Sequence, residues 1–155
     1  MTSRRVASII VGWREFLSLP DLGVPRIKAK IDTGARTSVL HAENVRYVRK
    51  GGRRMVRFTV LPKQRTEAGA VDAIAPFIEE RMVRSSNGES ERRPVIQTTL
   101  RLRDDEWPIE LTLTRRDVMG FRMLLGRAAL RGRALIDPGH SFLTTPSTKR
   151  RLKKK

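Results

Sequence analysis

The chain has 155 residues, which is enough for one domain with a modest core but not for two. With 39% hydrophobic and 32% charged residues, the composition is that of a folded protein and excludes a disordered chain. The 33 lysines and arginines outnumber the 16 aspartates and glutamates, and the formal net charge of +17 favours an anionic partner such as nucleic acid, a membrane surface or an acidic peptide. The absence of cysteine excludes disulfides and thiolate metal sites, and it fits a reducing compartment.

The N-terminal segment predicts a β-strand rather than a targeting or membrane segment. Arg4 and Arg5 precede an apolar run over residues 6–11, but Gly12 and Arg14 soon interrupt the apolar character. No stretch approaches the roughly 20 apolar residues that a membrane span needs. We therefore expect a cytoplasmic protein without a membrane segment, whose first strand lies over residues 6–11.

A period of two dominates the middle of the chain and indicates half-buried strands of an antiparallel sheet. Alternating faces of this kind occur at Val56, Phe58 and Val60, at Ile96, Thr98, Leu100 and Leu102, and at Trp107, Ile109, Leu111 and Leu113. Hairpin turns are expected at Gly51-Gly52, at residues 103–106 and at Asn87-Gly88. Asn87 and Gly88 are expected to form a two-residue turn at a solvent-exposed tip, because both central positions of such a turn need positive φ.

One short helix is predicted, over residues 127–131 directly after Gly126. Many closely spaced strands with a single small helix predict an all-β barrel or sandwich. Residues 1–146 are expected to form this domain. Residues 147–155 contain a run of lysine and arginine without apolar periodicity, and they are expected to form a basic disordered tail.

An Asp-Thr-Gly tripeptide is the first candidate for chemistry. Asp32, Thr33 and Gly34 follow a strand-like segment over residues 26–30 and precede an apolar run at 38–40, which places the tripeptide on a loop between strands. An acid peptidase needs a carboxylate at a rigid turn, where Gly34 lets the backbone approach closely and the Thr33 hydroxyl can hold the loop by a hydrogen bond. Taken alone, the tripeptide favours an ordinary turn, because Asp and Gly are common turn residues.

A second segment changes this interpretation. Residues 121–130 read Phe-Arg-Met-Leu-Leu-Gly-Arg-Ala-Ala-Leu, an apolar strand that runs into Gly126-Arg127 and then into the helix. Together with the Asp-Thr-Gly-Ala loop and the Asn87-Gly88 hairpin between them, this segment resembles the signature blocks and the flap of retropepsins. More narrowly, residues 6–145 resemble a bacterial retropepsin-like aspartic peptidase family, long labelled as an ATP-dependent zinc protease and associated with ATP-grasp ligases that add glutamates to proteins.

The resemblance implies a retropepsin-like closed barrel, one half of an acid protease, with a flap hairpin and one short C-terminal helix. It implies that Asp32, Thr33 and Gly34 are catalytic and that Gly126 and Arg127 are structural residues of the dimer. In the retropepsin scheme, two aspartates share one proton and activate a water molecule. Because this chain supplies a single Asp-Thr-Gly, the second carboxylate is expected from another copy in a homodimer.

A second carboxylate from the same chain is the alternative. Asp137, in Leu135-Ile136-Asp137-Pro138-Gly139, also follows an apolar strand. Pro138 has neither a hydroxyl nor a backbone donor, so Asp137 is interpreted as a turn residue that ends the strand.

Cationic residues surround the predicted site, and the substrate is expected to be a peptide or protein of acidic, Glu-rich character. The residues assigned to substrate binding are Ala35, Arg36, Arg84, Asn87, Gly88 and Arg93. Arg36 stands where retroviral enzymes commonly carry an acidic residue, so the usual ion-pair partner of Arg127 is missing. Arg36 can favour the ionised form of Asp32, hold an acidic side chain, or be a solvated charge. Arg84 and Arg93 are expected to bind carboxylates, with neutralisation by nearby glutamates as the alternative.

No cofactor and no metal are expected. Only His41 and His140 are available as histidine ligands, and neither a His-Glu-x-x-His helix nor a phosphate-binding loop occurs. Two rival functions remain: a basic module that binds RNA or a ribosome, and a retropepsin-like fold that binds partners without catalysis. The aromatic content of 5% and the lack of an RNA-recognition signature count against nucleic acid, and the intact Asp-Thr-Gly counts against the second rival.

Overall fold

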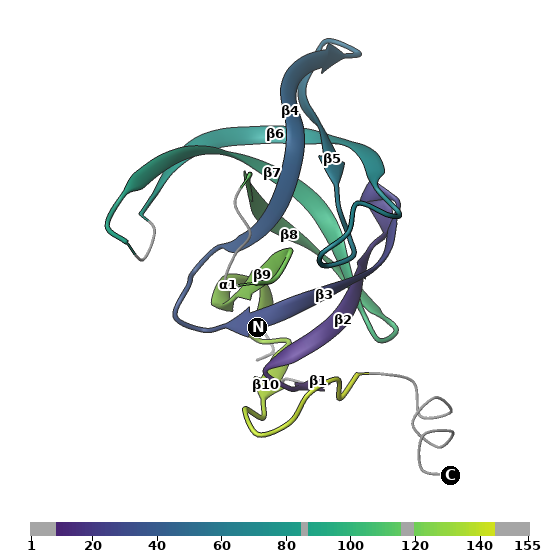
Figure 1. The fold of residues 1–155 in the computed structure, drawn as a ribbon, viewed down its shortest axis with the longest axis vertical. Coiled ribbons are helices and arrows are strands. Elements are labelled where there is room, and N and C mark those ends of the chain that lie inside the picture. Colours follow the sequence, from purple (N-terminus) through teal and green to yellow (C-terminus); the bar gives the residue numbers. More distant parts are fainter. Residues whose placement is uncertain (1–8, 85–86, 116–119, 145–155) are drawn as a thin grey trace, which may run out of the picture.

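The computed structural model describes residues 9–84, 87–115 and 120–144, and an 8-stranded sheet in these ranges closes into a ring beside a 2-stranded sheet (Figure 1). The strands are β1 (Ile9–Val11), β2 (Arg14–Leu19), β3 (Val24–Asp32), β4 (Ser38–Lys50), β5 (Arg53–Val60), β6 (Val71–Arg84), β7 (Ser90–Leu102), β8 (Asp105–Thr114), β9 (Met123–Gly126) and β10 (Ala134–Ile136). The helical segments are a 3₁₀ helix, η1 (Pro20–Leu22), and the short α1 (Arg127–Leu130). The all-β barrel with one short C-terminal helix is therefore confirmed.

The ring closes because strands that are distant in sequence pair with one another. The order of the large sheet is β2-β3-β9-β4-β5-β6-β7-β8. The pairing of β2 with β7 closes the ring, and β8 pairs with β7 and with β4. Three pairings are parallel: β1 with β10, β3 with β9, and β4 with β8. The expectation of an antiparallel sheet is therefore wrong for these pairs. Parallel strands need long connections, so no local turn signal in the sequence announces them.

The predicted hairpins are present, and one of them has a different turn. β4 and β5 are joined by Gly51 and Gly52, whose φ angles of 60° and 75° are those of the expected tight turn. β6 and β7 pair as far as Arg84 opposite Ser90, so residues 85–89 join them instead of a two-residue turn.

The turn between β6 and β7 also departs from the expected backbone angles. Of its described residues only Gly88 has a positive φ, of 88°. The Asn87 Oδ1 accepts a hydrogen bond from the Glu89 N–H at 3.0 Å, which bends the chain without a left-handed asparagine. The prediction of a two-residue Asn87-Gly88 turn is therefore wrong, although both residues are exposed as expected.

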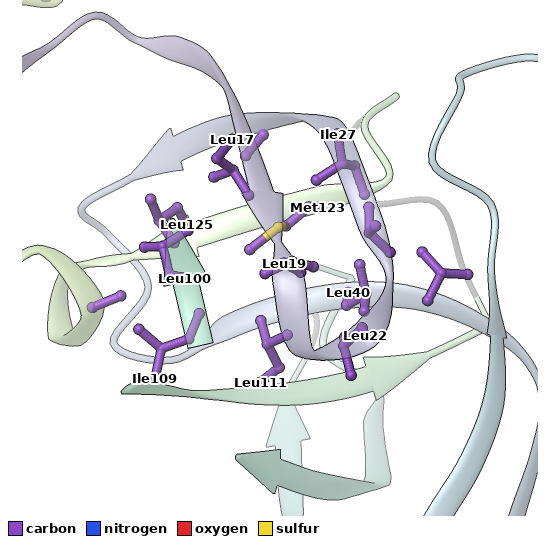
Figure 2. Packing of buried hydrophobic residues seen from close by; sticks show 14 of the residues in the cluster. Leu17, Leu19, Leu22, Ile27, Leu40, Leu100, Ile109, Leu111, Met123 and Leu125 are labelled. Atoms are coloured by element: carbon purple, nitrogen blue, oxygen red, sulfur yellow. The ribbon is translucent and has the colours of Figure 1, made fainter. Parts of the chain in front are cut away.

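The alternating faces predicted from the sequence form the core of the barrel (Figure 2). Leu100 of β7 and Leu111 of β8 are fully buried, and Leu19 of β2 packs in the same cluster. Met123 and Leu125 of β9 are also fully buried, and every residue of β9 is buried. The strand that leads into Gly126 is thus fixed by the core, and this places the residues that follow it.

A buried carboxylate fastens the C-terminal segment to the barrel. Glu15 of β2 is fully buried and accepts hydrogen bonds from the N–H groups of Gly12, Leu143 and Thr144 and from the Thr144 hydroxyl, at 2.6–3.1 Å. Four donors offset much of the cost of burying the charge.

The predicted tail at residues 147–155 and residues 6–8 of the first strand lie outside the described residues. No helix in the described part of the chain is long and apolar enough to span a membrane.

Candidate active site

Asp32 is the last residue of β3, where it pairs in register with Gly126 of β9. Its side chain is half-buried, and its Oδ1 accepts a hydrogen bond from the Gly34 N–H at 3.0 Å. The Asp32 carbonyl accepts a second one from the Ala35 N–H at 3.2 Å. A β-carbon on Gly34 would lie 3.2 Å from the same Oδ1, so the close approach predicted for this glycine is present. The carboxylate is therefore held at a tight turn.

Arg127 holds this turn and has no acidic partner among the residues that the structure describes. Its Nη1 donates hydrogen bonds to the carbonyl oxygens of Thr33 at 3.2 Å and Gly34 at 3.3 Å. The two carbonyls thus bind Nη1 of the guanidinium, while Arg36 stands at the position of the acidic residue of the retroviral pattern. Thr33 is exposed, and in a single copy its carbonyl, rather than the expected hydroxyl, takes part in holding the loop.

The first residues of α1 bind the loop that follows Asp32. The Arg127 N–H donates to the Ala35 carbonyl at 2.9 Å, and the Ala128 N–H donates to the Arg36 carbonyl at 3.0 Å. These donors would be unpaired at the start of an isolated helix, so the loop satisfies them. The backbone of Ala35 and Arg36 is thereby fixed, while the Arg36 side chain is exposed.

Gly126 packs directly against the backbone of the loop that follows Asp32. A β-carbon at this position would lie 2.8 Å from the Arg36 carbonyl oxygen and from the Thr37 carbonyl carbon, and 2.9 Å from the Ala35 carbonyl oxygen. These are backbone atoms that cannot swing away, so the position excludes any side chain. The Gly126 N–H also donates to the buried Ser38 Oγ at 2.9 Å. Gly126 and Arg127 are therefore brought against the Asp32 loop.

A cleft of about 560 Å³ opens beside this loop. Its walls come from the loop, β6, β7, β8 and α1: Arg36, Thr37, Ser38, Glu79, Arg81, Gln97, Pro108, Ile109, Glu110, Ala128 and Ala129. Asp32 is not part of the lining of a single copy, whereas Arg36, Thr37 and Ser38 of the segment that follows it are. The volume is in the range of small-molecule and peptide side-chain pockets.

Arg81 connects β6 to the loop across this cleft. Its guanidinium donates to the Glu79 carboxylate at 2.7 and 2.9 Å, to Glu110 at 3.3 Å and to the Thr37 hydroxyl at 3.3 Å. The hydrogen bond with Glu79 raises the pKa of Arg81 above its ordinary value. No sequence pattern singles out Glu79, Glu110 or Thr37 as parts of the site. They come from separate strands and loops, and only the closed barrel brings them together.

The two arginines of β6 and β7 that were predicted to bind an acidic substrate differ in their exposure to solvent. Arg84 is exposed at the end of β6, near the exposed Asn87 and Gly88. Arg93 is buried, with 7% of its surface exposed, and its Nε donates to the Glu91 carboxylate at 2.6 Å. The assignment of Arg93 to substrate binding is therefore corrected: it is paired within β7, which was the alternative given for these arginines.

Asp137 is confirmed as a turn residue. Its Oδ1 accepts a hydrogen bond from the Gly139 N–H at 3.0 Å, and its Oδ2 lies 2.8 Å from His140 Nδ1. The other histidine, His41, is buried and lies 2.8 Å from a Glu43 oxygen, beside a separate cavity of about 600 Å³. In residues 9–84, 87–115 and 120–144, no group of three or more histidine, aspartate or glutamate side chains is arranged to hold a metal ion.

Comparison with known proteins agrees with this geometry. A family model described as the retropepsin-like aspartic endopeptidase RimB, RimB-like, matches residues 10–147. Two curated proteins, each named a probable alpha-L-glutamate ligase, are 46% identical over 136 residues (Desulfotalea psychrophila) and 49% identical over 130 residues (Parasynechococcus marenigrum). These matches cover 88% and 84% of this chain but only 29% and 28% of the ligases, so the chain spans less than a third of their length.

A solved structure shares the fold. The crystal structure of Lpg0085 from Legionella pneumophila, a protein described as being of unknown function (DUF785), superposes with a TM-score of 0.74 at 30% identity. The similarity covers 90% of this chain and 100% of that one. With the family match, it confirms the retropepsin-like fold that the sequence predicted.

Proposed function

Since the chain belongs to the RimB-like family of retropepsin-like aspartic endopeptidases, we propose that it is one subunit of a homodimeric aspartic-type peptidase. The observation that carries this proposal is the way in which Asp32 is held. One of its oxygens accepts the Gly34 N–H at 3.0 Å, and its loop is bound by Arg127 and the start of α1. A carboxylate held rigidly at a turn, next to a loop that lines a cleft, is what an acid peptidase requires of each half of its site.

Two Asp32 carboxylates that meet across a two-fold axis cannot both ionise cheaply, so they share one proton and titrate as a pair. The ionised carboxylate takes a proton from a water molecule as the water oxygen attacks the carbonyl carbon of the peptide. The protonated carboxyl gives its proton to the carbonyl oxygen. Collapse of the tetrahedral intermediate then breaks the C–N bond, and the amine leaves with a proton from the pair.

The small sheet of β1 and β10 supports a dimer. Ile10 and Leu135 pair in register, and their side chains remain 56% and 61% exposed. Two large apolar residues side by side on a two-stranded sheet are costly to leave in water. A second copy would cover them through the same surface, as a two-fold interface requires.

We propose an acidic, Glu-rich peptide or protein as the substrate. Arg36 is exposed at the cleft and Arg84 is exposed at the end of β6, where both can meet carboxylates. Relatives that contain a segment similar to this chain are named probable alpha-L-glutamate ligases, which supports a functional link to an ATP-grasp ligase of that kind. The lack of cysteine fits a cytoplasmic setting for both activities.

The test is cleavage of a Glu-rich peptide library from acidic to neutral pH, with and without a chelator. We expect the wild-type chain to cleave, Asp32→Asn to lose at least about a thousandfold in rate, and the chelator to have no effect. The matched control is Asp21→Asn, which makes the same substitution at an exposed aspartate of η1 and should leave the rate unchanged. Cleavage that survives Asp32→Asn and is lost with the chelator would refute the aspartic mechanism.

Mixing experiments test the shared site directly. If each active site needs an Asp32 from both copies, adding an equal amount of Asp32→Asn chain to a fixed amount of wild type lowers its activity to about half after subunit exchange. An active monomer would keep its full activity in the mixture.

The dimer surface has its own test by light scattering. Leu135→Glu is expected to give a monomer without peptidase activity, because it puts a charge into the interface. Ile78→Glu, at an exposed position of β6, is the control and should remain dimeric. A Leu135→Glu chain that stays dimeric would contradict the assigned surface.

A further inference from the structure

The positive charge of this chain is concentrated in one stretch. Between Glu43 and Glu67 the sequence has no acidic residue, and it has eight basic ones: Arg46, Arg49, Lys50, Arg53, Arg54, Arg57, Lys63 and Arg65. The first six lie on the hairpin of β4 and β5, which we call the basic arm (residues 44–60). Figure 1 shows this arm standing out from the ring, on the side away from β1 and β10.

The register of the arm places four of these cations on one outward face. Arg46 pairs with Arg57, and Lys50 pairs with Arg53. Paired residues share a face, and successive residues alternate between faces. Because Phe58, next to Arg57, is buried in the core, the face that carries Arg57 points away from it. All four cations are exposed.

The outward cations have no acidic partner in the described part of the chain. Like charges directly opposite each other on neighbouring strands destabilise a sheet. The arm nonetheless has three such pairs, since Arg49 also stands opposite Arg54. A surface that costs stability in the free protein is best explained by an anionic ligand that relieves the repulsion.

The outward face of the arm is separate from the cleft. Ser38 at the start of β4 lines the cleft, and Arg46 is eight residues farther along the same strand. The opposite face of the arm contacts β6, where the Tyr47 hydroxyl donates to Glu80, but none of the four outward cations lines the cleft. Because side chains alternate between the two faces of a strand, the outward cations point away from this contact.

We propose that the outward face of the basic arm binds the phosphate backbone of double-stranded RNA. The Arg46–Arg57 and Lys50–Arg53 rows are four residues apart, or about 13 Å, so they can contact phosphates on both strands of a duplex. Arginine binds phosphate through two parallel hydrogen bonds, and three of the four cations are arginines.

The pair of residues between the two cation pairs indicates which nucleic acid the arm binds best. Val48 and Met55 pair there and are half-buried. They offer no donor or acceptor to read base edges in the major groove of DNA, and no aromatic ring on which single-stranded bases could stack. The wide, shallow minor groove of A-form RNA is recognised through shape and backbone, which needs neither. The low aromatic content therefore counts against single-strand binding but not against this partner.

The test is fluorescence anisotropy with a labelled RNA duplex of about 20 base pairs, longer than the roughly 16 that a double-stranded RNA-binding domain spans. The Arg46→Gln/Arg57→Gln variant should bind at least about tenfold more weakly at about 0.15 M salt, and the slope of log Kd against log salt should fall by about 2. Its thermal stability should be unchanged or slightly raised, because a like-charged pair has been removed.

The matched control is Arg101→Gln/Arg103→Gln, which removes the same charge from exposed positions at the junction of β7 and β8. It should change Kd by less than about twofold. Asp32→Asn should bind RNA like wild type, which separates this inference from the peptidase proposal. Equal losses in the two double variants, tighter binding to a DNA duplex, or displacement of RNA by a Glu-rich peptide at equal concentration would overturn it.

Discussion

The flap hairpin, formed by β6 and β7, and the basic arm are both rich in arginine, yet they hold their arginines in different ways. On the flap, Arg81 is bound by Glu79 and Glu110, and Arg93 is bound by Glu91. On the arm, basic residues face one another across the strands and have no such partners among the described residues. The number of arginines in a segment therefore does not tell how many are available to a ligand. Arg81 and Arg93 of the flap are held by carboxylates of the barrel, whereas the arm presents its charge to solvent.

The largest expected difference between the Asp32 loop and the arm is in how much one added methyl group lowers the free energy of unfolding. Gly126→Ala should lower the free energy of unfolding by about 3 kcal/mol or more, because the new β-carbon meets backbone atoms at 2.8–2.9 Å. Urea denaturation measures this loss. Gly51→Ala, at the tip of the arm, is the control: it meets no atom within 4 Å and should cost only about 1 kcal/mol for its positive φ.

The next largest expected difference is in how much the loss of a single arginine lowers the free energy of unfolding. Arg127→Ala should lower the free energy of unfolding by about 1–2 kcal/mol, because the carbonyls of Thr33 and Gly34 lose their donor. Arg57→Ala on the arm should change it by less than about 0.5 kcal/mol. Thermal unfolding followed by circular dichroism compares the two variants. Equal losses would mean that the arm arginines are structural too, which would remove the contrast.

A kinetic test separates the two hairpins further. Arg81→Gln should lower kcat/KM for a short acidic peptide by about tenfold, because Thr37 loses its link to β6 and two carboxylates lose their partner. Arg46→Gln should leave the same parameter unchanged, since Arg46 does not line the cleft and lies on the outward face of the arm. A loss of activity with Arg46→Gln would show instead that the arm takes part in cleavage.

The smallest expected effect is at the contact between the arm and the flap. The Tyr47 hydroxyl donates to a Glu80 oxygen at 2.6 Å, and burial together with this hydrogen bond raises the pKa of Tyr47 to about 12. Tyr47 is the only tyrosine, so tyrosinate absorbance reports on it alone. We expect the pH titration of this absorbance to have its midpoint near 12 in the folded protein and near 10 in urea.

The sign of the effect on stability follows from the raised pKa. The folded state favours the neutral phenol of Tyr47. The stabilisation that Tyr47 adds to the folded state is therefore complete below about pH 10, and it is lost as the pH rises toward 12. Glu80→Gln should move the titration midpoint of Tyr47 only part of the way back toward 10, because burial raises its pKa more than the hydrogen bond to Glu80 does. A midpoint near 10 in the folded wild type would show that the arm and the flap do not meet at Tyr47.

Elements that depend on local pattern could be predicted from the amino-acid sequence. The alternation in Val56, Phe58 and Val60 marks a strand with one buried face, because side chains alternate across a sheet. Gly51-Gly52 marks a tight turn, because both residues need positive φ. The Asp-Thr-Gly and Gly-Arg segments together carried the family resemblance, which the comparisons confirm.

Which residues meet, in contrast, depends on the closure of the barrel. The parallel pairing of β3 with β9 brings Gly126 beside Asp32, and no local signal announces a contact between segments so far apart. Burial and pairing of Arg93 likewise depend on how β7 packs, so a sequence that shows an arginine near a turn does not show whether it is free. Asp32 as a loop carboxylate could be read from the sequence, but what holds it in place is set by contacts that only the closed barrel creates.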